Sequence, residues 1–357
     1  MSIKKKIVDT TIWLLENKNR KRSVKCESQN MKNMTFEDLT EDEKKKVKTM
    51  WNMTDCKYHR MFKTFAGFDA RFVSDVVFLP RILRALNPIE MARAFEEKNL
   101  YSIIYPQIPQ PKNIVMCNRG CYFFNDKIID FSEAVIILNN CDGFIIKPTH
   151  DSTQGNNVRY IRPAIDDVKV VLEQYGKDFI TQEKLSQSSL TSVFNNTSLN
   201  SFRISTLNIN GRASLCNILF RCGQNGSVVD NGGAGGLMCG VFPDGKFHGF
   251  AYDKYYNRHV STKDGIRFEG HAIPFMEEIV DLTLKWHTKY LPHIGFAGWD
   301  IALDENDNPV MIEVNLRWPG IQFEQLCSET PLFGDRTEEV IDFVNHQKLR
   351  MMDVINV

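Results

Sequence analysis

The sequence predicts an α+β fold, in which a mostly helical N-terminal region precedes a part where strands and helices alternate. Three observations support this. In the first hundred residues, apolar side chains recur at three- and four-residue spacing, as on the buried face of a helix. After Pro106, short runs rich in β-branched and aromatic residues are bounded by Pro, Gly and Asn, which is typical of strands. The helices between these runs lack the strict βαβ period of a doubly wound sheet.

Composition excludes several classes of protein. The 357 residues carry 44 Lys+Arg and 44 Asp+Glu, whereas a protein that coats nucleic acid needs an excess of clustered cations, so we expect no nucleic-acid partner. No apolar run approaches the roughly 18 residues of a membrane span. The nine cysteines show no paired metal-ligand spacing, and we expect them to be reduced, as in a cytoplasmic protein.

The first 26 residues are strongly basic, because they hold only two acids, Asp9 and Glu16. The basic residues are Lys4, Lys5, Lys6, Lys18, Arg20, Lys21, Arg22 and Lys25. Between them, residues 7–15 would form a helix with Val8, Thr11, Ile12 and Leu15 on one stripe. Two interpretations stay open: an interfacial helix on anionic lipid, or a helix packed against its own domain.

A helical region is expected to follow. Thr40 and Glu43 form a capping box, which predicts a helix over 44–51. Residues 51–98 show further helical spacing, interrupted at Asn87-Pro88, where one helix ends and another restarts toward Lys98. Residues 1–98 therefore form one predicted region, of which residues 51–98 would shape an acceptor site or the interface of a homo-oligomer.

The alternating part of the chain contains eight predicted strands and three predicted helices. The strands are expected at residues 113–116, 121–124, 143–147, 178–183, 201–207, 215–222, 296–303 and 310–314. The helices are expected at residues 132–138, 165–175 and 274–290. No internal repeat interrupts this mixture.

The last two predicted strands form a hairpin that brings two acids together. If Asp304 pairs with Pro309 across the turn, antiparallel register places Asp300 directly opposite Glu313. Two carboxylates in this arrangement repel each other unless something positive lies between them. The hairpin therefore predicts a cation at this point.

Alternation along the second strand adds a third oxygen-bearing side chain. Glu313 and Asn315 share one face, whereas Ile312 and Val314 point to the other. Oxygen ligands of this kind suit Mg²⁺ bridging to substrate phosphates. The alternative is a surface hairpin with scattered acids, but a charge inside an apolar strand is costly without a partner.

Two strands carry isolated cations. Lys147 ends an apolar strand and precedes a polar loop that contains Gly155, so its ammonium and the loop N–H groups could hold phosphate oxygens. Arg203 lies in a strand whose alternate residues are apolar, which requires an anionic partner or an exposed face. A strand-edge lysine without a ligand remains the alternative for Lys147.

These pieces, in this order, resemble the ATP-grasp superfamily, and most closely its sugar-transfer-associated, TupA-like branch found with bacterial capsule and cell-surface polysaccharide genes. The resemblance rests on the segments EKNLY, FIIKP, QEKL, SLNSFRIST, GSVVDNGGAGG, FEGHAIPFMEEI, GWDIAL and IEVNLRWPGIQ. It implies an ATP-grasp fold, two α+β subdomains that grip ATP. Residues 99–184 would form the subdomain with the phosphate loop and residues 185–345 the one with the metal site.

The resemblance also implies a role for each candidate residue. The nucleotide would be bound by two phosphate lysines, a phosphate loop, a hinge that reads adenine and a ribose contact: Lys98 and Lys147; Ser152 and Gly155; Gln182, Glu183, Lys184 and Leu185; and Gln187. Two Mg²⁺ ions would be bound by Asp300, Glu313 and Asn315. Catalysis would involve Lys147, with Arg203 steadying the γ-phosphate and the acyl phosphate and Arg317 facing the acceptor.

The function implied is that of an ATP- and Mg²⁺-dependent carboxylate–amine ligase, which forms an amide through an acyl phosphate and releases ADP. Its partners would be a small or glycan-linked carboxylate and an amine, in bacterial capsular or cell-surface polysaccharide biosynthesis. A phosphotransferase acting on a glycan precursor and a non-catalytic nucleotide-binding scaffold remain alternatives. The expected location is the cytoplasm, with peripheral contact at the inner face of the membrane as the open question for the basic N-terminus.

Overall fold

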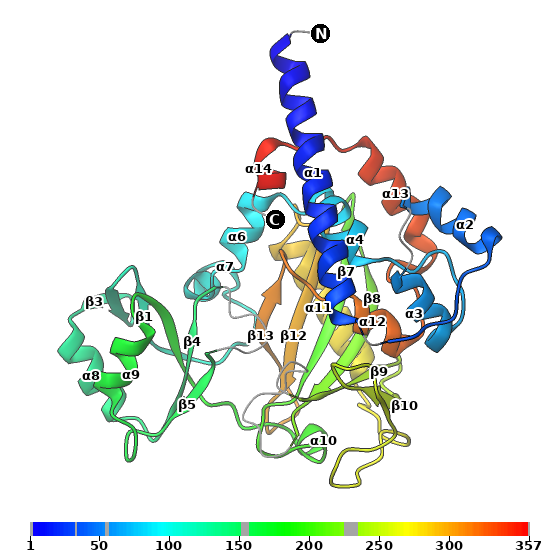
Figure 1. The fold of residues 1–357 in the computed structure, drawn as a ribbon. Helices are drawn as coiled ribbons and strands as arrows, with labels where there is room; N and C mark the ends of the chain where they lie inside the picture. The colour runs from blue at the N-terminus through cyan, green and yellow to red at the C-terminus, as the bar shows by residue number, and fades with distance from the viewer. Residues whose placement is uncertain (1–2, 33, 54–56, 151–156, 225–234, 356–357) are drawn as a thin grey trace.

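The computed structural model describes residues 3–32, 34–53, 57–150, 157–224 and 235–355. A six-stranded and a seven-stranded antiparallel sheet lie beside each other, and helices from the two ends of the chain pack around the larger sheet (Figure 1). The α+β class predicted from the sequence is therefore confirmed. A search of the described ranges for a helix that could cross a bilayer finds none.

Helices dominate the N-terminal region, as predicted. They are α1 (Ile3–Asn30), α2 (Glu41–Trp51), α3 (Lys57–Ala66), α4 (Asp75–Val77), the π-helix η1 (Phe78–Ile82), α5 (Leu83–Leu86), α6 (Ile89–Phe95), the 3₁₀ helix η2 (Lys98–Leu100) and α7 (Tyr101–Ile104). The capping box is formed by Thr40 and Glu43 at the start of α2. The predicted break at Asn87-Pro88 separates α5 from α6.

Asn87 connects this helical region to the larger sheet. Its buried side-chain amide donates to the carbonyls of Phe296 and Leu316 and accepts from the N–H groups of Gly295 and Phe296. Buried polar groups of this kind are costly when unpaired, so four hydrogen bonds fix the position of the helices against the strand that begins at Phe296.

The smaller sheet is built from residues 113–183. Its strand order is β3-β2-β1-β6-β4-β5, and its strands are β1 (Asn113–Asn118), β2 (Cys121–Phe124), β3 (Lys127–Ile129), β4 (Phe144–Pro148), β5 (Arg159–Ile161) and β6 (Asp178–Glu183). The helices α8 (Phe131–Asn139) and α9 (Val168–Tyr175) pack on one face, around a core that includes Phe144, Leu172 and Phe179. The short strands β3 and β5 were not predicted.

The larger sheet has the strand order β11-β10-β9-β8-β7-β12-β13. Its strands are β7 (Ser201–Ile209), β8 (Arg212–Cys222), β9 (Leu237–Val241), β10 (Phe247–Tyr252), β11 (Arg258–His259), β12 (Phe296–Leu303) and β13 (Pro309–Asn315). The remaining helices are α10 (Ser189–Ser192), α11 (Met276–Tyr290), α12 (Gln322–Ser328), the 3₁₀ helix η5 (Gly334–Arg336), α13 (Thr337–His346) and α14 (Met351–Ile355). The strands β9 to β11 were missed by the sequence prediction.

Alternation along β7 sends apolar and polar side chains to opposite faces of the larger sheet. Phe202 and Ile204 pack on the face covered by α11, in one core with Trp286 of that helix. Arg203, between them in sequence, therefore lies on the other face, where Glu324 of α12 is its neighbour. This second face carries the charged side chains described next.

Candidate active site

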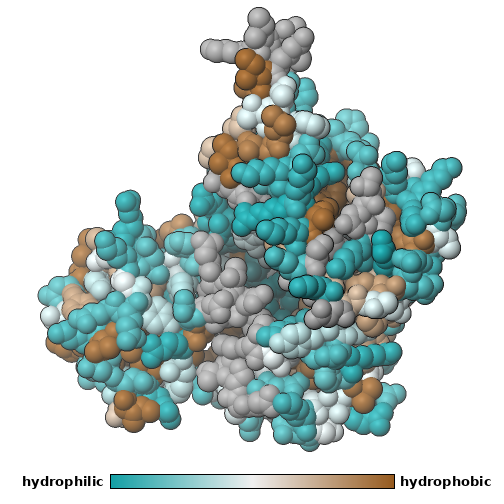
Figure 2. Space-filling model, viewed as in Figure 1, coloured by the Kyte–Doolittle hydropathy of each residue, from teal (hydrophilic) through white to brown (hydrophobic). Residues whose placement is uncertain are grey.

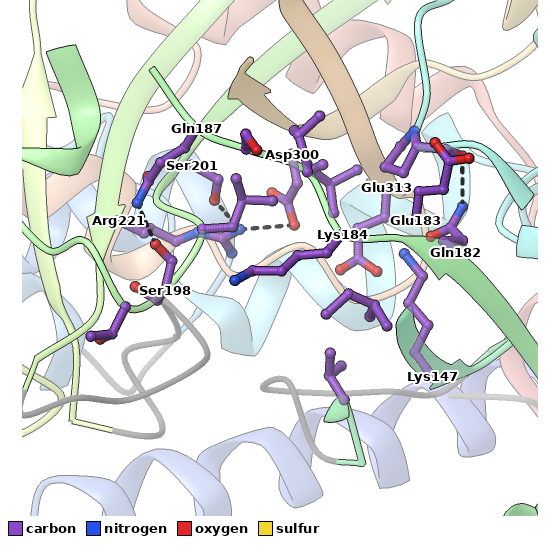
Figure 3. Close-up of a pocket in the computed structure, with 18 of the residues that line it drawn as sticks. Lys147, Gln182, Glu183, Lys184, Gln187, Ser198, Ser201, Arg221, Asp300 and Glu313 are labelled. Carbon is purple, nitrogen blue, oxygen red and sulfur yellow. Dashed lines mark hydrogen bonds and ion pairs between the residues drawn. The ribbon is translucent and has the colours of Figure 1, made fainter. Parts of the chain in front are cut away.

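A cavity of about 410 Å³ lies between the two sheets (Figure 3). It is lined by residues from both sheets and from the connection between them: Pro111, Ile145, Lys147, Val158, Gln182, Glu183, Lys184, Leu185, Ser186, Gln187, Ser192, Asn196, Thr197, Ser198, Leu199, Ser201, Arg221, Asp300, Ile312 and Glu313. Sites of this size between two structural units are common places for small ligands.

The predicted pairing of Asp300 with Glu313 is confirmed, but the pairing from which it was derived is wrong. Pro309 pairs with Leu303 instead of Asp304, and the register shifts by one residue between Asp300 and Ile301. The shift is a β-bulge, which inserts one extra residue into β13. Without the bulge, the pairing of Leu303 with Pro309 would place Asp300 opposite Ile312, so the bulge restores the opposition of the two acids.

The same bulge changes the surroundings of Glu313. Met311 pairs with Ile301 and Glu313 with Asp300, so Ile312 is the extra residue. Strict alternation predicted that Ile312 would point away from Glu313, but both line the cavity. The bulge thus places an apolar wall directly beside the carboxylate.

Asp300 is held by two arginines. Its Oδ2 lies 3.1 Å from Nη2 of Arg203 and 3.0 Å from Nη2 of Arg221, and its Oδ1 accepts from Nε of Arg203. Burial on its own would raise the pKa of the Asp300 carboxyl, but Arg203 and Arg221 outweigh it and lower that pKa to about 2. Asp300 is therefore an anion throughout the physiological pH range.

Two lysines lie near Glu313. The buried ammonium of Lys98 forms an ion pair with Oε2 of Glu313 at 3.1 Å. Lys147 is also buried, and no hydrogen bond or ion pair of its ammonium is found within the residues that the structure describes. Burial and the charge of Lys98 lower the pKa of Lys147 to about 8. Lys147 is thus a desolvated cation whose charged form an anionic ligand would stabilise.

The segment predicted as the hinge follows β6 and lines the cavity with Gln182, Glu183, Lys184, Leu185 and Gln187. The Gln182 amide donates to the carbonyl of Pro111 and to Oδ1 of Asn113, at 3.2 and 2.9 Å. The Lys184 ammonium lies 4.7 Å from the centre of the Tyr160 ring.

Gln187, which lines the cavity, forms hydrogen bonds to the segment 195–200. Its amide donates to the carbonyls of Asn195 and Ser198, at 2.9 and 2.7 Å. The side-chain oxygen Oε1 of Gln187 accepts from the backbone N–H of Asn200 at 3.1 Å. These bonds hold the polar segment 195–200 against the cavity, so Gln187 shapes the wall on which a ribose contact was predicted.

Arg317 is engaged outside the cavity. Its guanidinium forms an ion pair with Glu96, whose Oε1 also accepts from the backbone N–H of Arg317 at 2.8 Å. It is not among the residues that line the cavity, so the predicted role facing an acceptor stays a prediction. Ser152 and Gly155 of the predicted phosphate loop lie outside the described residues.

Two charged residues of the site were missed by the sequence analysis. Arg221 interrupts an apolar run on β8, the same signal that identified Arg203, and could have been found in the same way. Glu324 lies on α12, fully buried, with its Oε1 3.8 Å from Nη1 of Arg203. Burial raises the pKa of Glu324 to about 7, against the opposing effect of Arg203. No sequence signal marked it, because its neighbours Gln322 and Gln325 are polar.

The oxygen donors on β12 and β13 fit a hard divalent cation. Asp300 and Glu313 face each other across the two strands, and the amide of Asn315 donates to Oδ2 of Asp300 at 3.3 Å. Two carboxylates and an amide oxygen are the ligand types that Mg²⁺ takes. Within the described ranges, no cluster of three or more His, Cys, Asp and Glu side chains offers an alternative metal site.

The charges around the cavity suit an anion larger than a single carboxylate. Four cations surround the paired acids: the buried Lys98, Lys147 and Arg203, and the partly buried Arg221. In a space with little water, such an excess of positive charge favours a polyanionic ligand.

A sequence model of the family described as sugar-transfer associated ATP-grasp matches residues 80–340. No curated protein sequence matches the chain. Solved structures with a similar arrangement include the D-cycloserine synthetase DcsG, at 12% identity and a TM-score of 0.44, with 72% of this chain and 73% of that one covered.

This chain matches about half of the length of two further solved structures. The L-amino acid ligase from Bacillus licheniformis has 17% identity and a TM-score of 0.34, over 67% of this chain and 48% of that one. The biotin carboxylase from Campylobacter jejuni, in a β,γ-ATP complex, has 10% identity and a TM-score of 0.44, over 73% and 48%.

Proposed function

The chain belongs to the sugar-transfer associated ATP-grasp family, and on this premise we propose that it is an ATP- and Mg²⁺-dependent carboxylate–amine ligase. It would form an amide through an acyl phosphate and release ADP. The family description supports a carbohydrate-linked substrate, which we take to be a precursor of a bacterial capsule or other cell-surface polysaccharide. We place the reaction in the cytoplasm, where ATP is supplied.

The cavity offers separate surfaces for the parts of a nucleotide. Ile145 of β4, Leu185 and the bulged Ile312 are its apolar walls, and a flat base between them would be removed from water. Residues 183–185 also line the cavity, and their backbone would read the edge of the base by hydrogen bonds. Lys98 and Lys147 lie at the paired acids, where the phosphates would follow.

The metal would be held by Asp300, Glu313 and Asn315, and when bound it would neutralise charge on the phosphates of the nucleotide. In the structure these carboxylates are paired with Lys98, Arg203 and Arg221. Binding of the nucleotide would therefore redistribute the ion pairs, because the same cations can turn to the phosphate oxygens.

The proposed reaction has two steps. A carboxylate oxygen of the acceptor attacks the γ-phosphorus, the bond to the β-phosphate oxygen breaks, and ADP leaves. The nitrogen of the amine then attacks the carbonyl carbon of the acyl phosphate, inorganic phosphate leaves and the nitrogen loses a proton to water. Arg203 and Arg221 lie on adjacent strands, and they would stabilise the negative charge that moves between these groups.

One observation carries the proposal: the opposed Asp300 and Glu313 lie at a cavity between two sheets, surrounded by three buried cations and a fourth that is partly buried. A surface hairpin would not bury this many charges, since each costs free energy without a partner. A scaffold without turnover has no need for such an arrangement.

Release of ADP tests the proposal. The purified protein is incubated with Mg-ATP and a panel of sugar acids crossed with amines, and ADP, AMP and phosphate are measured. The expected result is ADP and phosphate in equal amounts, only where acid and amine are both present. A stable phosphorylated product without use of the amine would instead identify a phosphotransferase, and ATP binding without any ADP would identify a scaffold.

A further inference from the structure

The helix α1 extends beyond the rest of the molecule (Figure 1). Its 28 residues correspond to a length of about 42 Å. The second half of the helix is packed on the body: Asn19 donates to the carbonyl of Val354 at 2.9 Å, and Met31, just after the helix, is fully buried. In the first half, the described side chains at residues 7–10, 13 and 14 are exposed, whereas Thr11, Ile12, Leu15 and Glu16 are half-buried.

The projecting half carries an apolar collar, defined here as Ile7, Val8, Trp13 and Leu14. These side chains are 61%, 45%, 62% and 55% exposed. Successive residues of a helix point about 100° apart, so two adjacent pairs spread the collar around the helix rather than along one stripe. Figure 2 shows apolar side chains on this helix above a largely hydrophilic surface. A helix with apolar side chains on all sides is stable in water only when another surface, such as a protein or a membrane, covers those side chains.

Met352 and Ile355 of α14 extend this apolar surface. They are 47% and 55% exposed, and α14 packs directly against α1. The apolar surface is therefore continuous with the place where α1 joins the body.

A basic stripe, defined here as Lys18, Lys21 and Lys25, follows the collar. All three side chains are exposed, and their spacing continues the line of Ile7 and Leu14 along one side of the helix. Only two acids occur in the first 26 residues, and because the whole chain has no net charge, the remainder carries the matching negative excess. The charge of the molecule is thus strongly polarised toward α1.

We infer that α1 docks the protein on an anionic lipid bilayer, with the apolar collar in the interfacial layer and the basic stripe on the lipid headgroups. Tryptophan and flanking lysines are preferred at this depth of a membrane, and anionic headgroups attract basic helices. A second copy of the chain suits this surface less well, because two basic stripes would repel each other.

Sedimentation with vesicles tests this inference on the full chain. The vesicles consist of phosphatidylcholine alone or with about a third phosphatidylserine. The expected result is cosedimentation with the anionic vesicles only, weakened by salt. The variants Trp13→Ser/Leu14→Ser and Lys18→Glu/Lys21→Glu are each expected to lower the partition coefficient at least about tenfold.

Matched controls separate this effect from general changes in polarity or charge. Ile128→Ser/Ile136→Ser removes two similarly exposed apolar side chains, one on β3 and one on α8. Lys45→Glu/Lys48→Glu makes the same charge change on α2. Both are expected to bind vesicles as the unchanged protein does. Equal losses in these controls, or no binding by the unchanged protein, would overturn the inference. So would a dimer in light scattering that Trp13→Ser/Leu14→Ser abolishes, because a second copy would then be what covers the collar.

Discussion

Arg221 and Asp300 are ion-paired at 3.0 Å although the strand between them, β7, separates β8 from β12. The guanidinium reaches across this strand to the carboxylate that Arg203, on β7 itself, also binds. One anion thus holds together three strands of the larger sheet. The arrangement leaves Asp300 shared between two cations, either of which can turn to another anion while the other remains in place.

Replacement of Arg221 is expected to weaken nucleotide binding more than it weakens the fold. In Arg221→Ala, Arg203 still neutralises Asp300, so the free energy of unfolding should fall by only about 1–3 kcal/mol. The affinity for ATP should fall roughly 10- to 100-fold, because a charge-assisted contact to phosphate is lost. Calorimetric titration and chemical denaturation measure the two effects. Arg212→Ala, on the same strand but in an exposed pair with Glu339, is the control and should change neither.

Glu313→Gln is expected to abolish the effect of Mg²⁺ on the nucleotide. The substitution removes a metal ligand and a negative charge beside Lys98, so ATP without metal should bind at least as tightly as before. Mg²⁺ should no longer increase that affinity, and turnover should fall by about 10³ or more. Titrations with and without Mg²⁺ provide the comparison, with Glu305→Gln in the exposed hairpin turn as the control. An unchanged Mg²⁺ effect would show that the metal is held elsewhere.

The affinity for ATP is expected to decrease above pH 8. Lys147 has a pKa of about 8 in the folded protein without nucleotide, below its ordinary value of 10.5, so it is neutral at higher pH. Phosphate stabilises only the ammonium, and binding above pH 8 must therefore take up a proton, with affinity falling up to tenfold per pH unit. Calorimetry in buffers of different ionisation enthalpy measures this uptake.

The same linkage has the opposite sign for stability. Because the unfolded chain holds the proton on Lys147 more tightly, this lysine makes the folded state more stable as the pH rises from about 8. Lys147→Met should lose both the proton uptake and most of the affinity. Lys169→Met, on the exposed side of α9, should keep both, and proton uptake that persists in Lys147→Met would assign the titration to another group.

Glu324 is expected to make the protein less stable as the pH rises through neutrality. Its pKa is raised from 4.5 to about 7 by burial, so the folded state binds the proton more tightly than the unfolded chain. The contribution is complete below pH 4.5 and is lost as the pH rises through 7, by up to about 3 kcal/mol. Denaturation at pH 5.5 and pH 8 should show this loss in the unchanged protein and a much smaller one in Glu324→Gln. The exposed Glu338→Gln should behave as the unchanged protein, and a loss retained in Glu324→Gln would contradict the assignment.

Local patterns in the sequence were sufficient for several parts of the fold. The capping box at Thr40 and the break at Asn87-Pro88 depend on a few adjacent residues, and both were predicted. The strands β9 to β11 were missed because their alternation is weak. In β10, for example, His248 and Gly249 interrupt the apolar residues, and burial on both faces removes the polar half of the pattern.

The candidate site depended on contacts that sequence spacing does not encode. The opposition of Asp300 and Glu313 could be predicted, but the bulge at Ile312 could not, because nothing in the turn indicates which pairing will close it. Glu324 lies near Arg203 only because α12 packs against β8, β9 and β10. Arg221 could have been predicted, since a cation in a buried strand requires an anion.

Lys98 belongs to both halves of the molecule. Its backbone N–H donates to the carbonyl of Thr149, next to β4 of the smaller sheet, whereas its ammonium pairs with Glu313 of the larger sheet. The adjacent Asn99 donates to the carbonyl of Cys117, in the smaller sheet as well. Any rotation of one sheet against the other must therefore stretch or release the bond between Lys98 and Glu313. The ion pair between Lys98 and Glu313 therefore links the angle between the two sheets to the charge of the Glu313 carboxylate.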